Sequence, residues 1–301
     1  MAVDWSRLNL AVLGGDDREV VVAQTFLRLG VPVSVIGLPL GEALAGATPV
    51  PNLAEAVSEK DVLVAPVQGI DDDNTLRARF AVNPLQMTED VLSRIKPGAL
   101  FFIGKGNLTL LQAAARYGFK LIEIRDRDDF AVYNSVPTAE GAIQMAMSEL
   151  PITLHGARAL CIGFGRVGKT LARKLRGLDV ETAVAARRTA DLARVFELGC
   201  RPVPLAALAD EIGRVDVIFN TVPAMLLGAG MLSRVRKGTL IIDLASPPGG
   251  TDFGAARELG LKAILAPGLP GKVAPKTAGE IVATVLVELI ADELGQGVQS
   301  R

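Results

Sequence analysis

Short apolar runs alternate with helix-like stretches along the whole chain. Runs of this length are typical of buried strands, and the stretches between them carry apolar residues at helical spacing. The predicted strands are 10–13, 33–37, 62–66, 100–103 and 121–124 in the first half, and 159–162, 182–186, 217–220, 240–243 and 263–266 in the second. This alternation is typical of parallel sheets joined by crossover helices. Because the pattern occurs twice, we predict two Rossmann-like, doubly wound α/β domains.

Two further helices connect the predicted domains. The stretch 137–150 begins with a proline, which suits the first turn of a helix, and predicts a linking helix. Near the end, Thr277 and Glu280 have the spacing of a capping box, and the apolar positions that follow form one stripe. We expect this last helix to return to the first domain. The predicted division is a substrate-side domain over 1–136 with 276–296, and a nucleotide-binding domain over 137–275.

A glycine-rich segment follows the predicted strand 159–162 and opens a helix-like run. Its sequence is Gly163-Phe164-Gly165-Arg166-Val167-Gly168. In a dinucleotide-binding turn, the first glycine permits the tight turn, the second lets the backbone approach the pyrophosphate, and the third lets helix and strand pack closely. Free N–H groups at the start of the helix hold the phosphates. The strand and the helix on either side make this motif more specific than a bare GxGxxG, so we predict a dinucleotide site.

The end of the next predicted strand indicates which coenzyme binds. About 20 residues beyond the glycine turn, an NAD enzyme places a carboxylate against the ribose 2′-hydroxyl. Here the strand ends in Arg187 and Arg188, which carry positive charge. An arginine–phosphate contact contributes about 1.5–3 kcal/mol, which gives roughly tenfold to hundredfold preference. We therefore expect NADP, with NAD less favoured. The alternative is a solvated arginine pair that begins the next helix.

Composition narrows the class of protein. In 301 residues, 32 Lys and Arg nearly balance 33 Asp and Glu, so no strong field favours nucleic acid or an anionic membrane. Cys161 and Cys200 have neither disulfide-framework nor metal-ligand spacing, and we predict no metal. The start lacks a basic segment followed by an apolar core, and no apolar run reaches the ~20 residues of a membrane helix. We expect a cytoplasmic protein.

Segments that follow the strands are candidates for the site, because ligands bind beyond the carboxyl ends of strands in an open parallel sheet. The segment Asn220-Thr221-Val222-Pro223 could line the nicotinamide, or it could be an ordinary proline turn. The segment 243–252 begins with Asp243 and contains Gly249 and Gly250 near a helix start. Consecutive N–H groups there could hold a carboxylate, or the segment could be a flexible connection.

Other candidates lie in the first domain and at the domain crossing. Lys105, with Asn107 before a helix, offers a second candidate carboxylate site. Lys276, at the end of a proline-rich segment, could face the cleft or solvent. The segments 127–129 and 133–138 could contribute to the site or be structural ties. His155 is the only histidine, and it precedes its strand, so we assign it a structural or surface role.

Several of these segments together resemble the A subunit of bacterial dipicolinate synthases. The resemblance lies in Arg127-Asp128-Asp129, Tyr133-Asn134-Ser135, Pro137-Thr138, the glycine turn, Ala186-Arg187, and the segments 220–223, 243–246, 248–253, 266–271 and 273–279. It covers nearly the whole chain, and the segments after the last two strands are far more specific than the glycine turn. The chain departs from the family pattern mainly over 68–87 and 104–108.

The resemblance implies a reaction and its partners. The reaction is oxidation of a dihydrodipicolinate-type dicarboxylate from the lysine pathway to dipicolinate, with hydride transfer to NADP. The family acts in the mother cell during endospore formation, together with a smaller, flavoprotein-like B subunit, and we expect an oligomer. A flat dicarboxylate needs two anion pockets, which the turns at 249–251 and 105–107 could supply. Because hydride loss makes the ring aromatic, a strong enzymic base is unnecessary.

We assign residues to the coenzyme and to the substrate, and we identify no catalytic acid or base. The coenzyme residues are Gly163, Phe164, Gly165, Arg166, Val167, Gly168, Arg187, Arg188, Asn220, Thr221, Val222, Pro223 and Asp243. The substrate candidates are Lys105, Asn107, Asn134, Ser135, Thr138, Ser246, Gly249, Gly250, Thr251 and Lys276. Two alternatives stay open. One is a noncatalytic dinucleotide-binding scaffold for the flavoprotein-like partner, and the other is an NADP enzyme of the hydroxyacid or shikimate dehydrogenase type.

Overall fold

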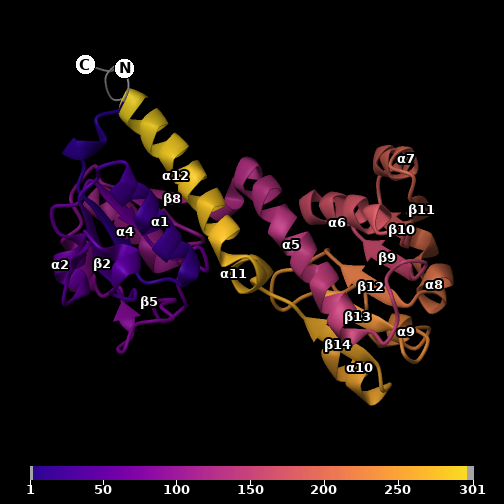
Figure 1. The fold of residues 1–301 in the computed structure, drawn as a ribbon. Coiled ribbons are helices and arrows are strands. Elements are labelled where there is room, and N and C mark those ends of the chain that lie inside the picture. Colours follow the sequence, from indigo (N-terminus) through magenta and orange to yellow (C-terminus); the bar gives the residue numbers. More distant parts are fainter. Residues whose placement is uncertain (1–2, 297–301) are drawn as a thin grey trace. The chain divides into compact units, whose positions relative to one another are not determined.

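The computed structural model describes residues 3–296 of the chain (Figure 1). The chain forms two compact units. Unit 1 comprises the residues up to Tyr133 together with the last helix from Pro275, and unit 2 comprises Asn134–Ala274. Each unit is built around a six-stranded sheet in which all neighbouring strands are parallel. The prediction of two Rossmann-like α/β domains is confirmed.

The sheet of unit 1 has the strand order β3-β2-β1-β4-β7-β8. The first strand in sequence lies in the middle, and the order reverses beside it, which is where doubly wound sheets open a crevice. The strands are β1 (Leu10–Leu13), β2 (Val33–Ile36), β3 (Thr48–Pro49), β4 (Val62–Val64), β7 (Leu100–Ile103) and β8 (Lys120–Glu123). The helices are α1 (Asp17–Arg28), α2 (Leu53–Val57), α3 (Glu89–Ser93), α4 (Leu108–Tyr117) and α12 (Pro275–Gln296), with 3-10 turns at Trp5–Arg7, Glu42–Leu44 and Ile124–Asp126.

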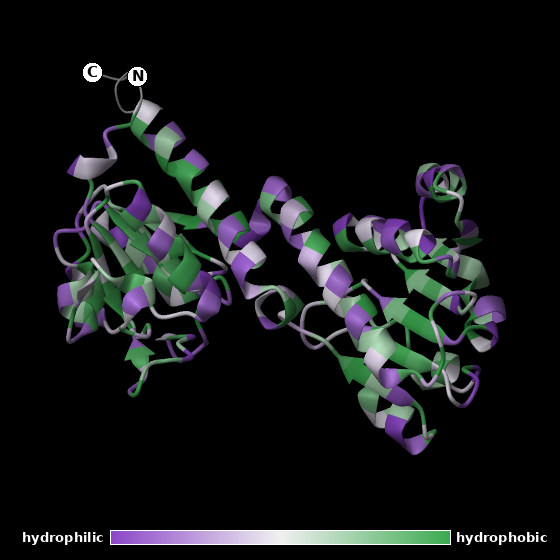
Figure 2. Cartoon of the chain, viewed as in Figure 1, coloured by the Kyte–Doolittle hydropathy of each residue, from purple (hydrophilic) through white to green (hydrophobic). Residues whose placement is uncertain are grey.

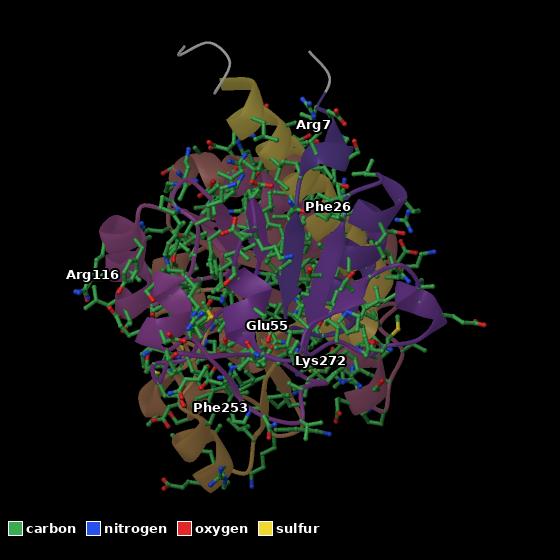
Figure 3. The ribbon with its side chains drawn as sticks, turned by 90° about the vertical axis from the view of Figure 1, so that its left-hand side faces the viewer. Arg7, Phe26, Glu55, Arg116, Phe253 and Lys272 are labelled. Atoms are coloured by element: carbon green, nitrogen blue, oxygen red, sulfur yellow. The ribbon has the colours of Figure 1, made fainter. Side chains whose placement is uncertain are left out.

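Two apolar clusters cover the faces of this sheet. One joins the sheet to α1 and α12 and includes the buried ring of Phe26, which Figure 3 labels inside the unit. A Cβ on Gly279 of α12 would lie 2.6 Å from the Val21 Cβ of α1, so glycine lets the two helices approach closely. The other cluster packs α2, α3 and α4 onto the opposite face. The return of the last helix to the first unit is thereby confirmed.

A small antiparallel hairpin interrupts the α/β alternation of unit 1. It comprises β5 (Thr75–Leu76) and β6 (Leu85–Gln86). The segment after β5 crosses the turn that follows β1. The Gly15 N–H donates to the Arg77 carbonyl (2.9 Å), and the Arg79 N–H donates to the Gly15 carbonyl (2.8 Å). The chain itself therefore covers the carboxyl end of β1.

The sheet of unit 2 repeats the topology, in the order β11-β10-β9-β12-β13-β14. Its strands are β9 (Arg158–Ile162), β10 (Glu181–Ala186), β11 (Arg201–Pro204), β12 (Val217–Asn220), β13 (Leu240–Asp243) and β14 (Lys262–Leu265). The helices are α5 (Asp128–Glu149), which begins before the unit does, α6 (Arg166–Gly177), α7 (Thr189–Glu197), α8 (Leu208–Glu211), α9 (Ala229–Leu232), α10 (Phe253–Glu258) and α11 (Leu269–Val273), with 3-10 turns at Leu205–Ala207 and Ile212–Arg214. The strands are predominantly apolar, whereas the helices alternate apolar and polar residues (Figure 2).

The linking helix begins earlier than predicted. We expected it to start at Pro137, but α5 starts at Asp128 and contains Pro137 in its interior. Proline removes one main-chain donor from a helix. The Thr138 hydroxyl supplies another donor one residue later, to the Asn134 carbonyl (2.7 Å). The prediction was wrong because proline is common in a first turn but is not confined to it.

Other boundaries differ because of prolines. The strands β3 and β11 are not among the predicted strands, and they contain Pro49, Pro202 and Pro204. Both lie at the edge of a sheet, where proline is tolerated. The helix α12 starts at Pro275, so Thr277 lies inside it and the predicted capping box is wrong. Proline suits the first helical turn, where its missing donor is not needed.

Candidate coenzyme site

The glycine turn lies at the centre of the unit 2 sheet. Strand β9 pairs with β10 on one side and β12 on the other, and the turn connects its carboxyl end to α6. Gly165 is the N-cap residue of α6, and as a glycine it has no side chain that could cap the first N–H groups of that helix. Gly165 and Arg166 are exposed. The positive end of the helix dipole is therefore open to an anion.

The three glycines of this turn are required for different reasons. Gly163 has a φ of 99°, and a Cβ on it would lie 2.4 Å from the Thr221 Oγ1. A Cβ on Gly168 would lie 2.3 Å from the Gly163 carbonyl oxygen. Gly165 has a φ of −79°, and a Cβ on it would meet nothing within 4 Å. The fold alone does not require glycine at 165, and the open space there suits a pyrophosphate that approaches the backbone.

Phe164 and Val167 of the turn have side chains that are largely withdrawn from solvent. The Phe164 ring is buried in the core of unit 2, and the Lys169 ammonium lies 5.6 Å from its centroid. Val167 is half-buried beside it. Contact between Phe164 and a coenzyme is therefore limited to the main chain.

The two predicted arginines differ in how they are engaged. The Gly163 N–H donates to the Ala185 carbonyl (2.9 Å), so the chain leaves β10 beside the glycine turn. Arg188 forms a bidentate pair with Asp191 (2.7 and 2.9 Å), and its hydrogen bonds hold the pKa of Asp191 below its usual range. Arg187 is exposed, and its side chain makes no hydrogen bond or ion pair with any residue from 3 to 296. Arg187 is thus the one whose guanidinium can bind a phosphate without breaking another contact.

The segment after β12 lies against the glycine turn. Both the N–H and the hydroxyl of Thr221 donate to the Ile162 carbonyl (2.9 Å each). Val222 contacts the same turn, because a Cβ on Gly163 would lie 2.8 Å from its Cγ2. Pro223 is exposed. The structure therefore brings Thr221 and Val222 to the glycine turn, as the prediction requires of coenzyme residues.

Asn220 and Asp243 are engaged by hydrogen bonds within unit 2. They end neighbouring strands at the same register, and both are completely buried. The Asn220 side chain donates to Asp243 (3.1 Å) and bonds both main-chain groups of Val222 (3.1 Å each). These hydrogen bonds favour a role in holding the loops, and contact of the two side chains with the coenzyme stays a prediction. A polar residue at the last position of two adjacent strands is the signal that could have indicated this role.

The predicted anion pocket of the 243–252 loop is closed by the loop itself. Asp243 accepts hydrogen bonds from the Gly250 N–H (2.9 Å) and the Thr251 hydroxyl (2.6 Å). The Gly249 N–H donates to the Ser246 carbonyl (2.9 Å). The two glycine N–H groups that we expected to bind a carboxylate are therefore already occupied. Ser246 itself is exposed.

The candidates on α5 are engaged within unit 2. Ser135 is buried, and its hydroxyl lies 2.7 Å from that of Thr170 on α6, which ties the two helices together. Thr138 is bonded to the Asn134 carbonyl, as described above, and Asn134 is half-buried. These contacts favour the structural alternative for Ser135 and Thr138, and their contact with substrate stays a prediction.

The remaining substrate candidates belong to unit 1. The Lys105 ammonium lies 2.7 Å from Asp126 and 3.0 Å from Glu123, and these hydrogen bonds raise the pKa of Lys105. Asn107 caps α4 by accepting from the Leu110 N–H (2.9 Å). Lys276 is exposed in the first turn of α12. A substrate carboxylate at Lys105 would have to compete with two carboxylates of the protein.

His155 and the cysteines lie outside the coenzyme site. His155 is 77% exposed, and its Nδ1 lies 3.6 Å from the Asp179 carboxylate before β9 begins. Cys161 is fully buried in β9, and burial raises the pKa of its thiol far above the usual range. Among residues 3–296, no cluster of three or more His, Cys, Asp or Glu side chains could hold a metal ion. The same residues contain no helix with the length and apolar character needed to cross a bilayer.

The fold and the open glycine turn define a dinucleotide-binding protein, and its match to a dehydrogenase family makes it an oxidoreductase subunit. Residues 133–246 match the family described as the D-isomer specific 2-hydroxyacid dehydrogenase NAD binding domain, and residues 9–125 match the N-terminal domain of the dipicolinate synthase A subunit. The A subunit of dipicolinate synthase from Bacillus subtilis (strain 168) is 38% identical over 287 residues, which cover 95% of this chain and 96% of that protein. The chain therefore belongs to the family of dipicolinate synthase A subunits, and its resemblance to that family is confirmed.

Solved structures agree with this assignment. The crystal structure of the dipicolinate synthase A subunit from Bacillus halodurans has a TM-score of 0.90 at 36% identity, with 94% of this chain and 98% of that chain covered. The corresponding crystal structure from Bacillus subtilis has a TM-score of 0.88 at 37% identity, with 96% and 97% covered. The whole two-unit architecture is therefore shared with these proteins.

Proposed function

We propose that this chain oxidises a dihydrodipicolinate-type dicarboxylate to dipicolinate, with NADP as the hydride acceptor. The observation that carries the proposal is Gly165. It is the N-cap residue of α6 at the centre of the sheet, it has no side chain to cap that helix, and a Cβ on it would meet no atom within 4 Å. A phosphate-bearing ligand explains both features, because it needs free N–H groups and close approach to the backbone.

Arg187 supports NADP over NAD. It directly follows β10, beside the glycine turn, and makes no other polar contact with the described residues. In a dinucleotide-binding fold this is the place of the adenosine ribose. The nearby carboxylate of Asp191 is bound by Arg188 and is thus shielded from a 2′-phosphate. Arg187 would bind that phosphate, and the N–H groups at the start of α6 would bind the pyrophosphate.

The substrate is proposed from the family to which the chain belongs. NADP, when bound, accepts one hydride from the dihydropyridine ring. The ring also loses one proton, so a dihydrodipicolinate becomes aromatic dipicolinate and the hydrogen atoms balance. Asp243 is unsuited to accept that proton, because it is buried and four groups of the protein donate to it. We propose that the proton leaves to solvent, since aromatisation supplies much of the driving force.

The unsuitability of Asp243 as a base favours a second candidate function. If no acid or base acts in unit 2, the chain could bind the dinucleotide as a scaffold, and a flavoprotein-like partner could carry out the chemistry. The two proposals are separated by monitoring the reduction of NADP by absorbance while the dihydro compound is oxidised. Under the dehydrogenase proposal, this chain reduces NADP alone or with the partner, and the Arg187 and Gly165 variants change the rate. The scaffold proposal expects none at this chain's nucleotide.

The central test is a Gly165→Val variant. We expect NADP affinity to fall on the order of 100-fold, because the valine side chain would occupy the space of the pyrophosphate and cost at least two charge-assisted contacts. The free energy of unfolding should change little, since a Cβ at 165 meets no protein atom. Calorimetric titration with NADP and thermal unfolding measure the two quantities.

Gly228→Val is the matched control. Gly228 is also an N-cap residue with negative φ (−75°), and a Cβ on it likewise meets nothing within 4 Å. We expect NADP affinity to be unchanged in this variant. Equal NADP affinity in the Gly165 and Gly228 variants would contradict the proposed coenzyme site.

The family also leads us to propose a cytoplasmic setting in the mother cell of a sporulating bacterium, and assembly into a hetero-oligomer.

A further inference from the structure

An arginine-lined cavity lies at the edge of the unit 2 sheet opposite to the glycine turn. Strands β9, β10 and β11 begin at Arg158, Glu181 and Arg201, and their amino ends meet at this edge because they are parallel. Arg176 in the last turn of α6 and Arg214 at the end of a 3-10 turn also reach it. The cavity has a volume of about 470 Å³, within the range of small-ligand sites, and all five of these charged residues line it.

The carboxylates at this edge do not neutralise the arginines. Glu211 lies mostly buried beside the cavity and pairs with Arg201 (2.5 Å) and Arg214 (3.8 Å). The hydrogen bond from Arg201 holds the pKa of Glu211 below its usual range. Glu181 lies 3.7 Å from Arg158, and both side chains are more than half exposed, so this pair contributes little. Two carboxylates thus face four guanidiniums, which leaves a surplus of positive charge.

The Arg176 side chain has no ionic partner among residues 3–296. Its guanidinium makes no ion pair or hydrogen bond with any of them. Its guanidinium packs against Gly199, where a Cβ would lie 3.0 Å from the Nη2 atom and the φ is 75°. Glycine therefore leaves room for the planar guanidinium at the cavity wall. A structural role as the partner of a carboxylate does not account for this arginine.

We infer that this cavity binds a small anion with two or more negative charges. Guanidinium groups bind phosphate and carboxylate groups in bidentate fashion, and four of them around one cavity suit an anion that carries several such groups. Arg176 binds without losing a partner, and Arg158 exchanges its weak pair with Glu181 for the ligand. The site is distinct from the coenzyme site, because the two lie at opposite ends of β9.

The test is calorimetric titration of the full chain with inorganic pyrophosphate and, separately, with dipicolinate at about 0.15 M salt. It is run in the Gly165→Val background, so that pyrophosphate does not bind at the glycine turn. We expect saturable binding of at least one probe. Tighter binding of pyrophosphate identifies a phosphate ligand, and tighter binding of dipicolinate identifies a polycarboxylate.

Single arginine variants locate the binding. Arg176→Gln leaves no carboxylate without a partner. We expect it to lower the affinity for the tighter-binding probe by roughly tenfold, the effect of losing one charge-assisted contact. Arg158→Gln should act in the same direction. Arg257→Gln is the control, because Arg257 also lies in the last turn of an exposed helix, α10, but does not line the cavity. The inference is overturned if neither probe binds saturably, or if the Arg176 and Arg257 variants bind equally. Both outcomes can be read whether or not NADP is the coenzyme.

Discussion

The two units share a topology, but they treat the turn after their first strand in opposite ways. In unit 2 the turn after β9 leaves Gly165 exposed and the start of α6 uncapped. In unit 1 the corresponding turn after β1 is closed from inside. The Glu19 carboxylate accepts from the Asp16 N–H (2.7 Å) and the Val67 N–H (2.9 Å), and both acidic side chains are buried. A carboxylate of the protein thus occupies the N–H groups that an anion would use.

The hairpin closes the same turn from outside. A Cβ on Gly14 would lie 2.9 Å from the Cβ of Ala78, and the main chain of this segment is bonded to Gly15, as described above. Arg18 completes the closure by pairing with Asp16 (2.9 Å) while only 4% exposed. The shared topology therefore does not by itself make a binding site, because the chain must also leave the helix N-terminus unfilled.

The same substitution in both turns should have the largest and most unequal effect. A Cβ on Gly15 would lie 2.3 Å from the buried Glu19 side chain, and Gly15 has a φ of 107°. We expect Gly15→Ala to lower the free energy of unfolding by about 3–5 kcal/mol through strain and overpacking. Gly165→Ala should change it by less than about 0.5 kcal/mol, as an exposed substitution without a clash. Denaturant unfolding of both variants measures this, and equal effects would contradict the contrast between the turns.

The buried carboxylate of unit 1 should make stability depend on pH. Burial raises the pKa of Glu19 from 4.5 to about 7, despite the opposing charge of Arg18. A group whose pKa is raised by folding contributes stability below its unfolded pKa, and this contribution is lost as the pH rises through the folded pKa. The Glu19 contribution should therefore be present near pH 4.5 and absent above pH 7.

Glu19→Gln checks this prediction, since glutamine does not titrate. The wild type minus variant difference in free energy of unfolding should be larger at about pH 5 than at about pH 8, on the order of 2–3 kcal/mol. Other titrating groups are common to both proteins and cancel in the difference. A difference that is the same at both pH values would mean that Glu19 is ionised throughout and that unit 1 holds a permanent buried charge. No such slope is expected from Asp191 in unit 2, whose pKa is lowered.

The smallest effect concerns the coenzyme's 2′-phosphate. We expect Arg187→Ala to lower the preference for NADP over NAD by roughly tenfold, because one charge-assisted contact is lost. Arg188→Ala should change the preference less, since that guanidinium is held by Asp191. Titrations with both coenzymes measure the two ratios. If Arg188→Ala proves the more damaging variant, the assignment of the 2′-phosphate to Arg187 is wrong.

Most strands of both sheets could be predicted from the sequence, because a buried parallel strand has the pattern of a short apolar run. Predicted and observed bounds coincide for 10–13, 100–103, 217–220 and 240–243. The glycine turn could be predicted because its motif lies in one continuous segment between one strand and one helix. The proline-containing edge strands β3 and β11 and the true starts of α5 and α12 could not be predicted, because the effect of proline depends on its place in the fold.

The sequence by itself determined the two α/β units, the return of the last helix and the open turn of unit 2. Only the tertiary structure decided how polar side chains are used. Lys105, Asp243 and Gly250 all lie at or beyond the carboxyl ends of strands, where ligands bind. Lys105 is nevertheless paired with Glu123 and Asp126, and Asp243 accepts from the Asn220 side chain and from the Gly250 N–H. The periodicity of apolar residues indicates which side chains are buried, because burial follows a local pattern. It does not record which partner a polar group meets, because that depends on segments that only folding brings together.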